Sequence, residues 1–279
     1  METRTFQKII YRHFQENPRP LPWRSTTDPY AIMVSEVMLQ QTRVERVLPR
    51  YEAFLARFPT VAALAHAPLA EVLALWQGLG YNRRGMMLQR AAAEILEQHG
   101  GSVPTAPVAL ERLPGIGRYT AGAIAAFAYG HPTPFIETNI RSVFIHLFFN
   151  GRTAVADSEI LPLVERTMDR SNIRDWYNAL MDYGAMLKKK IPNPSRRSCQ
   201  QSRQTPFRGS NREIRGQVLK LLLAAPGLPA AEIVLRSAKD EARVRAVLAT
   251  LEREGLLQER SGGYWAGGGP MIAAPHQEN

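Results

Sequence analysis

Apolar residues recur at helical spacing along most of the chain, and convincing strand-like alternation occurs only near its C-terminal end. Residues 5–15 form a short amphipathic segment, and Asp28-Pro29 has the form of an N-cap followed by proline at the first helical position. From there to about residue 129, the apolar periods are broken by prolines and by Gly78-Leu79-Gly80. More helices are predicted from Asn139 to Leu187. The pattern predicts a mainly α-helical protein.

The composition changes after Leu187. Residues 191–210 are polar and basic and lack an apolar period, which predicts a linker. Amphipathic helices are predicted beyond it, and the stretch after Gly255 is typical of a two-stranded hairpin; the three helices cover 211–224, about 229–236 and 240–254. Three helices followed by a hairpin predict a winged-helix-like module over 211–266, with residues 267–279 as a disordered tail.

The most informative stretch is Leu113-Pro114-Gly115-Ile116-Gly117-Arg118-Tyr119-Thr120, which reads as a helix end, a glycine-containing hairpin and the start of a second helix. Gly115 and Gly117 supply backbone angles that a side chain would forbid, and they let another backbone come close. The free N–H groups at the start of the second helix then point outward and suit a phosphodiester without reading a base. A plain αα-hairpin is the alternative, and the carboxylate of Glu137, seventeen residues after Thr120, speaks against it.

Length, charge and cysteine content narrow the class of protein. A chain of 279 residues can hold two or three compact units, and its formal net charge is +10. No apolar run reaches the roughly 18 residues of a membrane span, and the N-terminus lacks a secretory pattern. With Cys199 as the one cysteine, no intrachain disulfide or cysteine metal cage is expected. We expect a monomer in the cytoplasm, associated with the nucleoid.

The positive charge is concentrated in one stretch that only Glu213 opposes. Such a block is a solvated face or flexible linker, or else a nucleic-acid tract, and the neighbouring phosphate-binding hairpin favours the tract. Its members are Lys188, Lys189, Lys190, Arg196, Arg197, Arg203, Arg208, Arg212 and Arg215.

Glu36 lies in an apolar helix, where an ionised carboxylate is expensive to bury. It is either a glutamate at the edge of that face, paired with an arginine, or a carboxylic acid with a raised pKa that protonates a leaving base. Glu36 alone favours the first interpretation.

The motifs around Glu36 favour the second interpretation, that of a catalytic acid. The chain resembles the helix-hairpin-helix DNA glycosylases, which have a DNA-gripping hairpin, a Gly/Pro loop and a carboxylate in this order, and it most closely resembles the MutY adenine DNA glycosylases. The resemblance covers about residues 20–187, and it implies a six-helix domain over 24–132 and a second helical domain from 1–23 and 133–190. The matching motifs are Leu21-Pro22-Trp23-Arg24, Ser35-Glu36-Val37-Met38-Leu39-Gln40-Gln41-Thr42, Trp76-Gln77-Gly78-Leu79-Gly80-Tyr81, the hairpin, and Met181-Asp182-Tyr183-Gly184-Ala185-Met186.

The resemblance implies a role for each matching residue. Glu36 is similar to the acid that protonates the purine ring nitrogen, and Glu137 to the carboxylate that stabilises the sugar cation or guides water. Tyr119 stands where bifunctional relatives place a lysine, and tyrosine cannot form a Schiff base. The remaining positions are Asn139 as the partner of Glu137; Gln40, Gln41 and Tyr81 as wedge residues; Arg24 beside the flipped base; and Gly115, Gly117, Arg118, Thr120, Lys188, Lys189 and Lys190 as DNA contacts.

The chain departs from the family at Glu137, where the family carries aspartate. The extra methylene moves the carboxylate oxygens by about a bond length, and errors near 1 Å can cost about a hundredfold in rate. This change leaves three explanations open: the pocket is shaped to fit glutamate, the catalytic step at Glu137 is slow, or the substrate differs.

A second departure concerns the iron–sulfur cluster that the family holds with four cysteines after the Gly-Ala-Met segment. The matching positions are Lys188, Ser195, Ser198 and Gln204, with Cys199 one place out of register. None of the four supplies a thiolate, so we expect no cluster and no other cofactor. The resemblance allows a monovalent cation at the hairpin carbonyls.

A third departure is the C-terminal module, which does not resemble the Nudix domain that senses oxidised guanine in the family. The module binds duplex DNA through its third helix and hairpin, or it docks a protein; DNA is favoured, and the basic candidates are Arg243, Arg245, Arg253 and Arg260.

These features predict a monofunctional DNA glycosylase of base excision repair. Its expected partner is double-stranded DNA with a mismatched or damaged base, and its expected substrate is adenine opposite oxidised guanine or guanine. One alternative is a glycosylase for hypoxanthine, uracil or mismatched thymine. Another is a lesion-binding protein that has lost catalysis through the change to Glu137. A winged-helix transcription factor would leave residues 20–187 unexplained.

Overall fold

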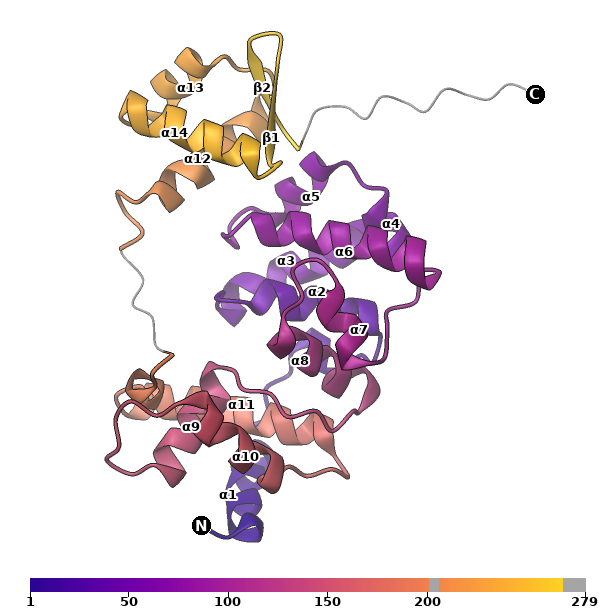
Figure 1. The fold of residues 1–279 in the computed structure, drawn as a ribbon, viewed down its shortest axis with the longest axis vertical. Coiled ribbons are helices and arrows are strands. Elements are labelled where there is room, and N and C mark those ends of the chain that lie inside the picture. Colours follow the sequence, from indigo (N-terminus) through magenta and orange to yellow (C-terminus); the bar gives the residue numbers. More distant parts are fainter. Residues whose placement is uncertain (201–205, 268–279) are drawn as a thin grey trace, which may run out of the picture. The chain divides into compact units, whose positions relative to one another are not determined.

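The computed structural model describes residues 1–200 and 206–267. They belong to two compact units, both dominated by helices (Figure 1). Unit 1 comprises Met1–Val37 and Val103–Arg203, and unit 2 comprises Met38–Ser102 and Gln204–Asn279. The predicted mainly α-helical class is confirmed. The predicted disordered tail lies, from residue 268 on, outside the described residues.

Unit 1 is built around the long helix α11, which packs against α1, α8 and α9. Phe6 of α1 is fully buried in this core, with ring centroids 5.3 Å from Phe144 and 5.6 Å from Trp176. The helices of this unit are α1 (Thr3–Glu16), the 3₁₀ helix η1 (Pro22–Arg24), α2 (Pro29–Leu39, whose last residues join unit 2), α7 (Pro107–Arg112), α8 (Arg118–Tyr129), α9 (Thr138–Phe148), α10 (Asp157–Thr167), α11 (Ile173–Lys190) and the 3₁₀ helix η2 (Pro194–Arg197).

Local signals fix several of these helix ends. Asp28 accepts hydrogen bonds from the backbone N–H groups of Tyr30 (3.1 Å) and Ala31 (3.3 Å), which confirms the predicted cap of α2. Gly130 ends α8 in the left-handed region at φ 67°. These caps orient the two helices that carry Glu36 and the hairpin.

Unit 2 contains the remaining helices and a two-stranded sheet. The elements are α3 (Val44–Arg57), α4 (Val61–Ala65), α5 (Leu69–Trp76), α6 (Arg83–His99), α12 (Asn211–Ala224), α13 (Ala230–Ser237), α14 (Glu241–Arg253), β1 (Leu257–Arg260) and β2 (Gly263–Ala266). Strands β1 and β2 are antiparallel, with Leu257 opposite Ala266, and Tyr264 donates a backbone hydrogen bond to Leu228 at 3.0 Å. Helices α12 to α14 with this hairpin have the predicted winged-helix-like arrangement.

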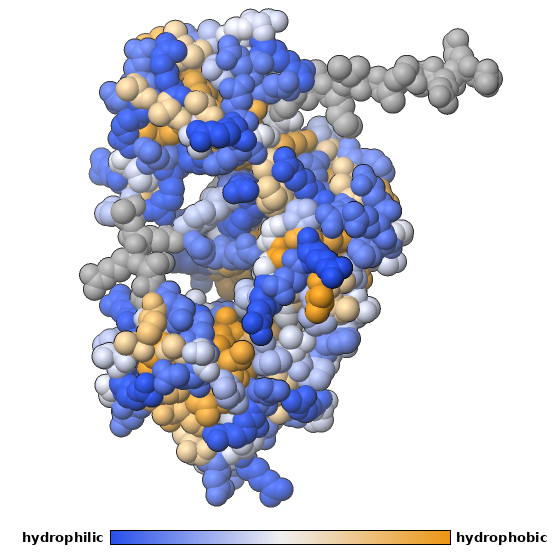
Figure 2. Space-filling model, viewed as in Figure 1, coloured by the Kyte–Doolittle hydropathy of each residue, from blue (hydrophilic) through white to orange (hydrophobic). Residues whose placement is uncertain are grey.

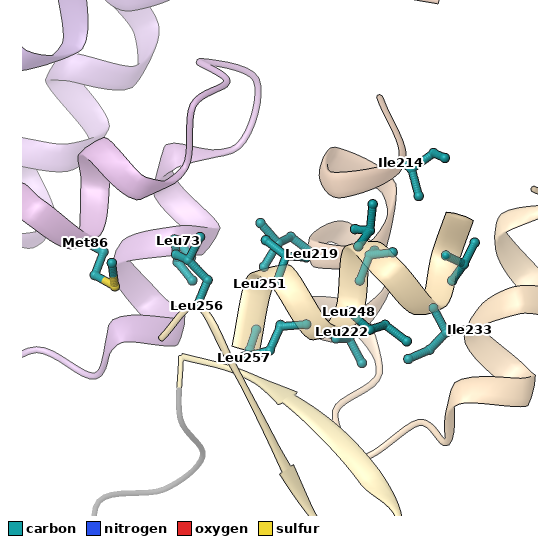
Figure 3. Packing of buried hydrophobic residues seen from close by; sticks show 14 residues of the cluster. Leu73, Met86, Ile214, Leu219, Leu222, Ile233, Leu248, Leu251, Leu256 and Leu257 are labelled. Carbon is teal, nitrogen blue, oxygen red and sulfur yellow. The ribbon is translucent and has the colours of Figure 1, made fainter. Parts of the chain in front are cut away.

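One apolar cluster joins this module to helices α5 and α6 (Figure 3). Leu73 of α5 and Met86 of α6 belong to the same buried cluster as Leu251, Leu256 and Leu257 of the module. Burying such side chains together stabilises unit 2 by the removal of apolar surface from water. The sequence pattern predicted the module as a separate element, so this shared core is a finding of the structure.

Residues 191–200 differ from the predicted linker. They include the 3₁₀ helix η2, which packs on α9, and Ser195 is buried. The guanidinium of Arg197 donates to the carbonyls of Ile145 and Phe149, both at 3.0 Å, and so satisfies acceptors at the C-terminal end of α9. Polar contacts of Arg197 hold this segment against α9, and hydrophobic periodicity does not reveal such contacts.

Candidate active site and nucleic-acid interface

Helices α7 and α8 and the turn between them form the predicted helix-hairpin-helix. Gly115 has φ +76°, as predicted, and Ile116 is buried, with its N–H donating to Leu113 at 3.1 Å. Gly117 has φ −90° and ψ 172°, an extended conformation that any residue adopts, so the predicted special angle there is wrong. A Cβ added to Gly117 would meet nothing within 4 Å, which leaves the start of α8 open to an approaching backbone.

The first turn of α8 presents backbone N–H groups without partners inside the helix, as at any helix N-terminus. Arg118 in this turn is exposed, and its contact with DNA stays a prediction. The side chain of Thr120 is buried at 2% exposure because it lies on the inner face of α8. Of the predicted pair, therefore, Arg118 has an exposed side chain and Thr120 a buried one.

Glu36 lies on α2, a helix that is apolar on nearly all sides, and it is 4% exposed. Burial raises its pKa from 4.5 to about 7, and the charge of Glu137 adds to this, while a hydrogen bond from Tyr119 acts in the opposite direction. The Tyr119 hydroxyl donates to Oε2 of Glu36 at 3.2 Å. Burial also raises the pKa of Tyr119 well above its ordinary value, so the tyrosine keeps its proton and remains a donor.

Glu137 is the N-cap of α9. Its Oε1 accepts from the backbone N–H groups of Asn139 (2.5 Å) and Ile140 (2.8 Å), and its Oε2 accepts from Nδ2 of Asn139 (3.2 Å). Burial raises the pKa of Glu137, while the Asn139 and Ile140 amides and the cations of Lys188 and Arg141 lower it. The longer glutamate side chain is thus held at both oxygens at the positive end of a helix.

Helix α11 packs closely against the start of α9, where Glu137 is the cap. A Cβ on Gly184 would lie 2.3 Å from the carbonyl oxygen of Asn139, so only glycine allows the two helices to approach this closely. One turn further along α11, Lys188 is half-buried and its charge reaches Glu137. Lys188 therefore faces the candidate site, whereas Lys189 and Lys190 are exposed and remain available for the predicted DNA contact.

Arg24, predicted beside a flipped base, makes a two-pronged ion pair with Asp182 of α11. Both pairs of atoms, Nη1 with Oδ2 and Nη2 with Oδ1, lie 2.8 Å apart, and Arg19 donates to the same Oδ1 at 3.0 Å. Asp182 is 2% exposed, so two arginines neutralise one buried carboxylate. Asp182 stands within one of the matching motifs, but its pairing with two arginines could not be predicted from the sequence.

The predicted wedge residues lie in unit 2, on the connections that follow α2 and α5. Tyr81 is 40% exposed and precedes α6, and Gln40 and Gln41 precede α3. Gln41 and Tyr81 both have left-handed backbone conformations, with φ 53° and 47°. Such conformations are uncommon for residues other than glycine and gather at functional sites.

The positions that match the family's cluster ligands do not fit an iron–sulfur cluster. Ser195 and Ser198 are buried side chains with hydroxyl oxygens, and Lys188 offers an ammonium group, whereas the cluster needs thiolates. Gln204 lies outside the described residues. Cys199 is exposed, and its Sγ donates to the carbonyl of Ala154 at 2.9 Å.

Within the predicted basic tract, Arg203 lies outside the described residues, and the other members divide into exposed side chains and side chains that contact the protein. Arg196 is exposed, but Arg197 is turned inward, and Arg215 pairs with Glu254. In the module, Arg245 pairs with Glu241 within α14 at 2.8 Å.

The face shown in Figure 2 is largely hydrophilic. Among the described helices, none is long and apolar enough to cross a membrane.

Comparison with known proteins agrees with these features. Residues 34–162 match a family model described as "HhH-GPD superfamily base excision DNA repair protein". The chain is 33% identical over 267 residues to the adenine DNA glycosylase of Mycolicibacterium smegmatis, covering 89% of this chain and 91% of the relative. It is 35% identical over 212 residues to the human adenine DNA glycosylase, covering 72% of this chain and 38% of the relative.

Solved structures give the same fold. A thermostable thymine-DNA glycosylase superposes with a TM-score of 0.60 at 26% identity, over 68% of this chain and 88% of that chain. A trapped endonuclease III–DNA covalent intermediate superposes with a TM-score of 0.56 at 16% identity, over 67% of this chain and 87% of that chain. The chain belongs to the HhH-GPD superfamily of base excision DNA repair proteins and, within it, to the family of the adenine DNA glycosylases.

Proposed function

We propose that this protein hydrolyses the N-glycosidic bond of adenine mispaired with oxidised guanine or guanine in double-stranded DNA. The observation that carries the proposal is the trio of Glu36, Tyr119 and Glu137 in unit 1. The charge of Glu137 raises the pKa of Glu36 there, and a protonated tyrosine donates to Glu36. Carboxyl groups in two different environments are the usual arrangement for glycosidic hydrolysis.

In this mechanism Glu36 donates its proton to a purine ring nitrogen while the bond between the base and the sugar breaks. The bonding electron pair leaves with the base, and the sugar becomes a cation at the anomeric carbon. Glu137, held by Asn139, stabilises that cation or guides the water whose oxygen bonds to the anomeric carbon. The proton that this water loses passes to Glu137 or to solvent, and Glu36 is reprotonated from solvent. With a pKa of about 7, a substantial share of Glu36 carries the required proton at neutral pH.

The same trio supports the absence of a lyase step. Tyr119 occupies the site beside Glu36 and cannot form a Schiff base with the sugar. The ammonium group of Lys188 lowers the pKa of Glu137, and burial lowers the pKa of Lys188 itself. Borohydride trapping with wild type and Lys188→Met tests this directly: no covalent protein–DNA adduct is expected from either, and an adduct lost only in Lys188→Met would show a lysine-based lyase.

A different excised base is the second candidate, and the likeness to a thymine-DNA glycosylase structure favours including it. Single-turnover base release on a panel of duplexes decides between them, with adenine opposite oxidised guanine, guanine and cytosine, and with hypoxanthine, uracil and mismatched thymine. Adenine release is expected from the first two duplexes. Release of another base would identify that base as the substrate in place of adenine. Binding without release from any duplex would indicate a lesion-binding protein.

Three variants connect the activity to the site. Glu36→Gln and Glu137→Gln are expected to abolish release but keep duplex binding, whereas Glu137→Asp retains the charge. Glu52→Gln, on the exposed side of α3, is the matched control for the same chemical change. Unchanged turnover in Glu36→Gln would remove Glu36 from the role of acid.

A further inference from the structure

The predicted wedge residues Gln41 and Tyr81 in unit 2 share a left-handed backbone conformation. Gln41 and Tyr81 stand in the left-handed region at φ 53° and 47° on separate connections, one before α3 and the other before α6. A residue with a side chain adopts this conformation at a cost, and it persists only where the surrounding structure holds it. Something in unit 2 therefore holds both connections.

Arg84, in the first turn of α6, contacts each connection at the carbonyl that directly precedes its left-handed residue. Its guanidinium donates to the carbonyl of Gln40 through Nη1 and to the carbonyl of Gly80 through Nη2, the latter at 3.2 Å. These two carbonyls belong to the peptide groups that immediately precede Gln41 and Tyr81. One side chain thereby fixes the orientation of both peptide planes that lead into the strained residues.

Further contacts of the same guanidinium tie the two connections to each other. Arg84 donates to the carbonyl of Met38 at 3.1 Å, to Oγ1 of Thr42 at 2.9 Å and to the carbonyl of Leu79 at 3.4 Å. The hydroxyl of Thr42 donates in turn to the carbonyl of Leu79 at 3.2 Å. The planar fork of arginine can serve several acceptors at once in fixed directions, which a lysine ammonium cannot reproduce.

The guanidinium also lies against aromatic rings. Its Cζ atom is 5.6 Å from the ring centroid of Trp76 and 5.5 Å from that of Tyr81. Trp76 is fully buried and donates through Nε1 to the carbonyl of Gly80 at 3.2 Å. Burial lowers the pKa of Arg84 to about 10, so it remains charged at neutral pH. The half-buried Arg84 thus contacts both the buried ring of Trp76 and the exposed ring of Tyr81.

We infer that Arg84 is a positioning residue that locks Gln41 and Tyr81 into one preformed wedge for displacing a base from the DNA stack. The inference rests on the proposed function and on the wedge role that the family resemblance implies for Gln41 and Tyr81. Without Arg84 the two connections would have to be ordered during flipping itself, which adds to the cost of unstacking. Arg84 acts through the wedge and not on the breaking bond.

The test compares three variants. Arg84→Met keeps the aliphatic stem and removes every donor, and Arg84→Lys keeps the charge without the fork. Arg83→Met, at the exposed neighbour in the same helical turn, removes the same charge and is the matched control. Flipping is followed by the fluorescence of 2-aminopurine placed at the target position, and base release by single-turnover kinetics, after thermal unfolding has established that each variant is folded.

Arg84→Met is expected to release adenine from a mismatched duplex about tenfold more slowly than Arg83→Met, since displacement of a positioning group by about 1 Å can cost a hundredfold. On a duplex whose target adenine faces an abasic site, the defect is expected to shrink to less than about threefold, because an unpaired base costs less to flip. The 2-aminopurine signal should fall in parallel. The pH profile of release should keep its midpoint.

An equal defect on both duplexes would assign Arg84 a general structural role and overturn the inference, as would Arg84→Met behaving like Arg83→Met. If Arg84→Met does not fold, Arg84→Lys carries the same comparison. A wild-type protein that releases no base from any duplex would refute the proposed function instead, while the fluorescence comparison would still decide the role of Arg84.

Discussion

Replacement of Glu36 by glutamine should separate the stability of this protein from its activity. Glutamine has the shape of a protonated glutamate and keeps a group that can accept the hydrogen bond from Tyr119. It cannot ionise, however, so it avoids the free-energy cost of a buried negative charge, the cost that raises the pKa of Glu36 to about 7. The variant should therefore gain stability at alkaline pH while losing base release.

The magnitude follows from the pKa interval. In the unfolded chain the Glu36 carboxyl titrates at its ordinary value of 4.5, and in the folded protein it titrates at about 7. Between these values the folded state holds more protons than the unfolded state, so stability falls as the pH rises through this window and is level above it. The interval is worth about 3 kcal/mol, at about 1.4 kcal/mol for each pH unit.

Urea unfolding of wild type and Glu36→Gln, at about pH 4 and about pH 9, measures this quantity. The difference in unfolding free energy between the two proteins should shift by about 3 kcal/mol in favour of the variant at the alkaline pH. Taking that difference cancels the titrating groups that do not interact with Glu36. A difference that stays constant within about 1 kcal/mol across this range would show that Glu36 is not destabilised by its surroundings.

Three further outcomes are expected. Single-turnover base release should decline above about pH 7 as Glu36 loses its proton, and a rate that is flat to about pH 9 would contradict its role as acid. Gly184→Ala should impair folding and release, because its Cβ would lie 2.3 Å from the Asn139 carbonyl oxygen; the control Gly216→Ala, in open space on α12, should gain about 0.5–1 kcal/mol in denaturant unfolding. Leu256→Ala should destabilise unit 2 by about 2–5 kcal/mol, measured by thermal unfolding, and a smaller loss would mean that the shared core can collapse around the site.

The sequence alone determined the helices and the main chemical groups of this protein. Apolar spacing placed the helix observed at Asn211–Ala224 without error, and the proline and cap at Asp28 marked the start of α2. These signals are local, since a helix depends on side chains three or four residues apart and on its own caps. The resemblance of the motifs to the glycosylase family predicted that Glu36 and Glu137 serve one site.

Only the tertiary structure decided which polar groups meet. Arg84 contacts a carbonyl 44 residues away, Arg197 one 52 residues away, and Arg24 a carboxylate 158 residues away. Thr120 is buried and Lys188 faces Glu137, although both were predicted as contacts for DNA. A sequence shows that a charge is present, but its partner is often a backbone carbonyl, which every residue carries and no residue name distinguishes. The fold alone chooses among such acceptors, because it decides which carbonyls are left without a helical partner.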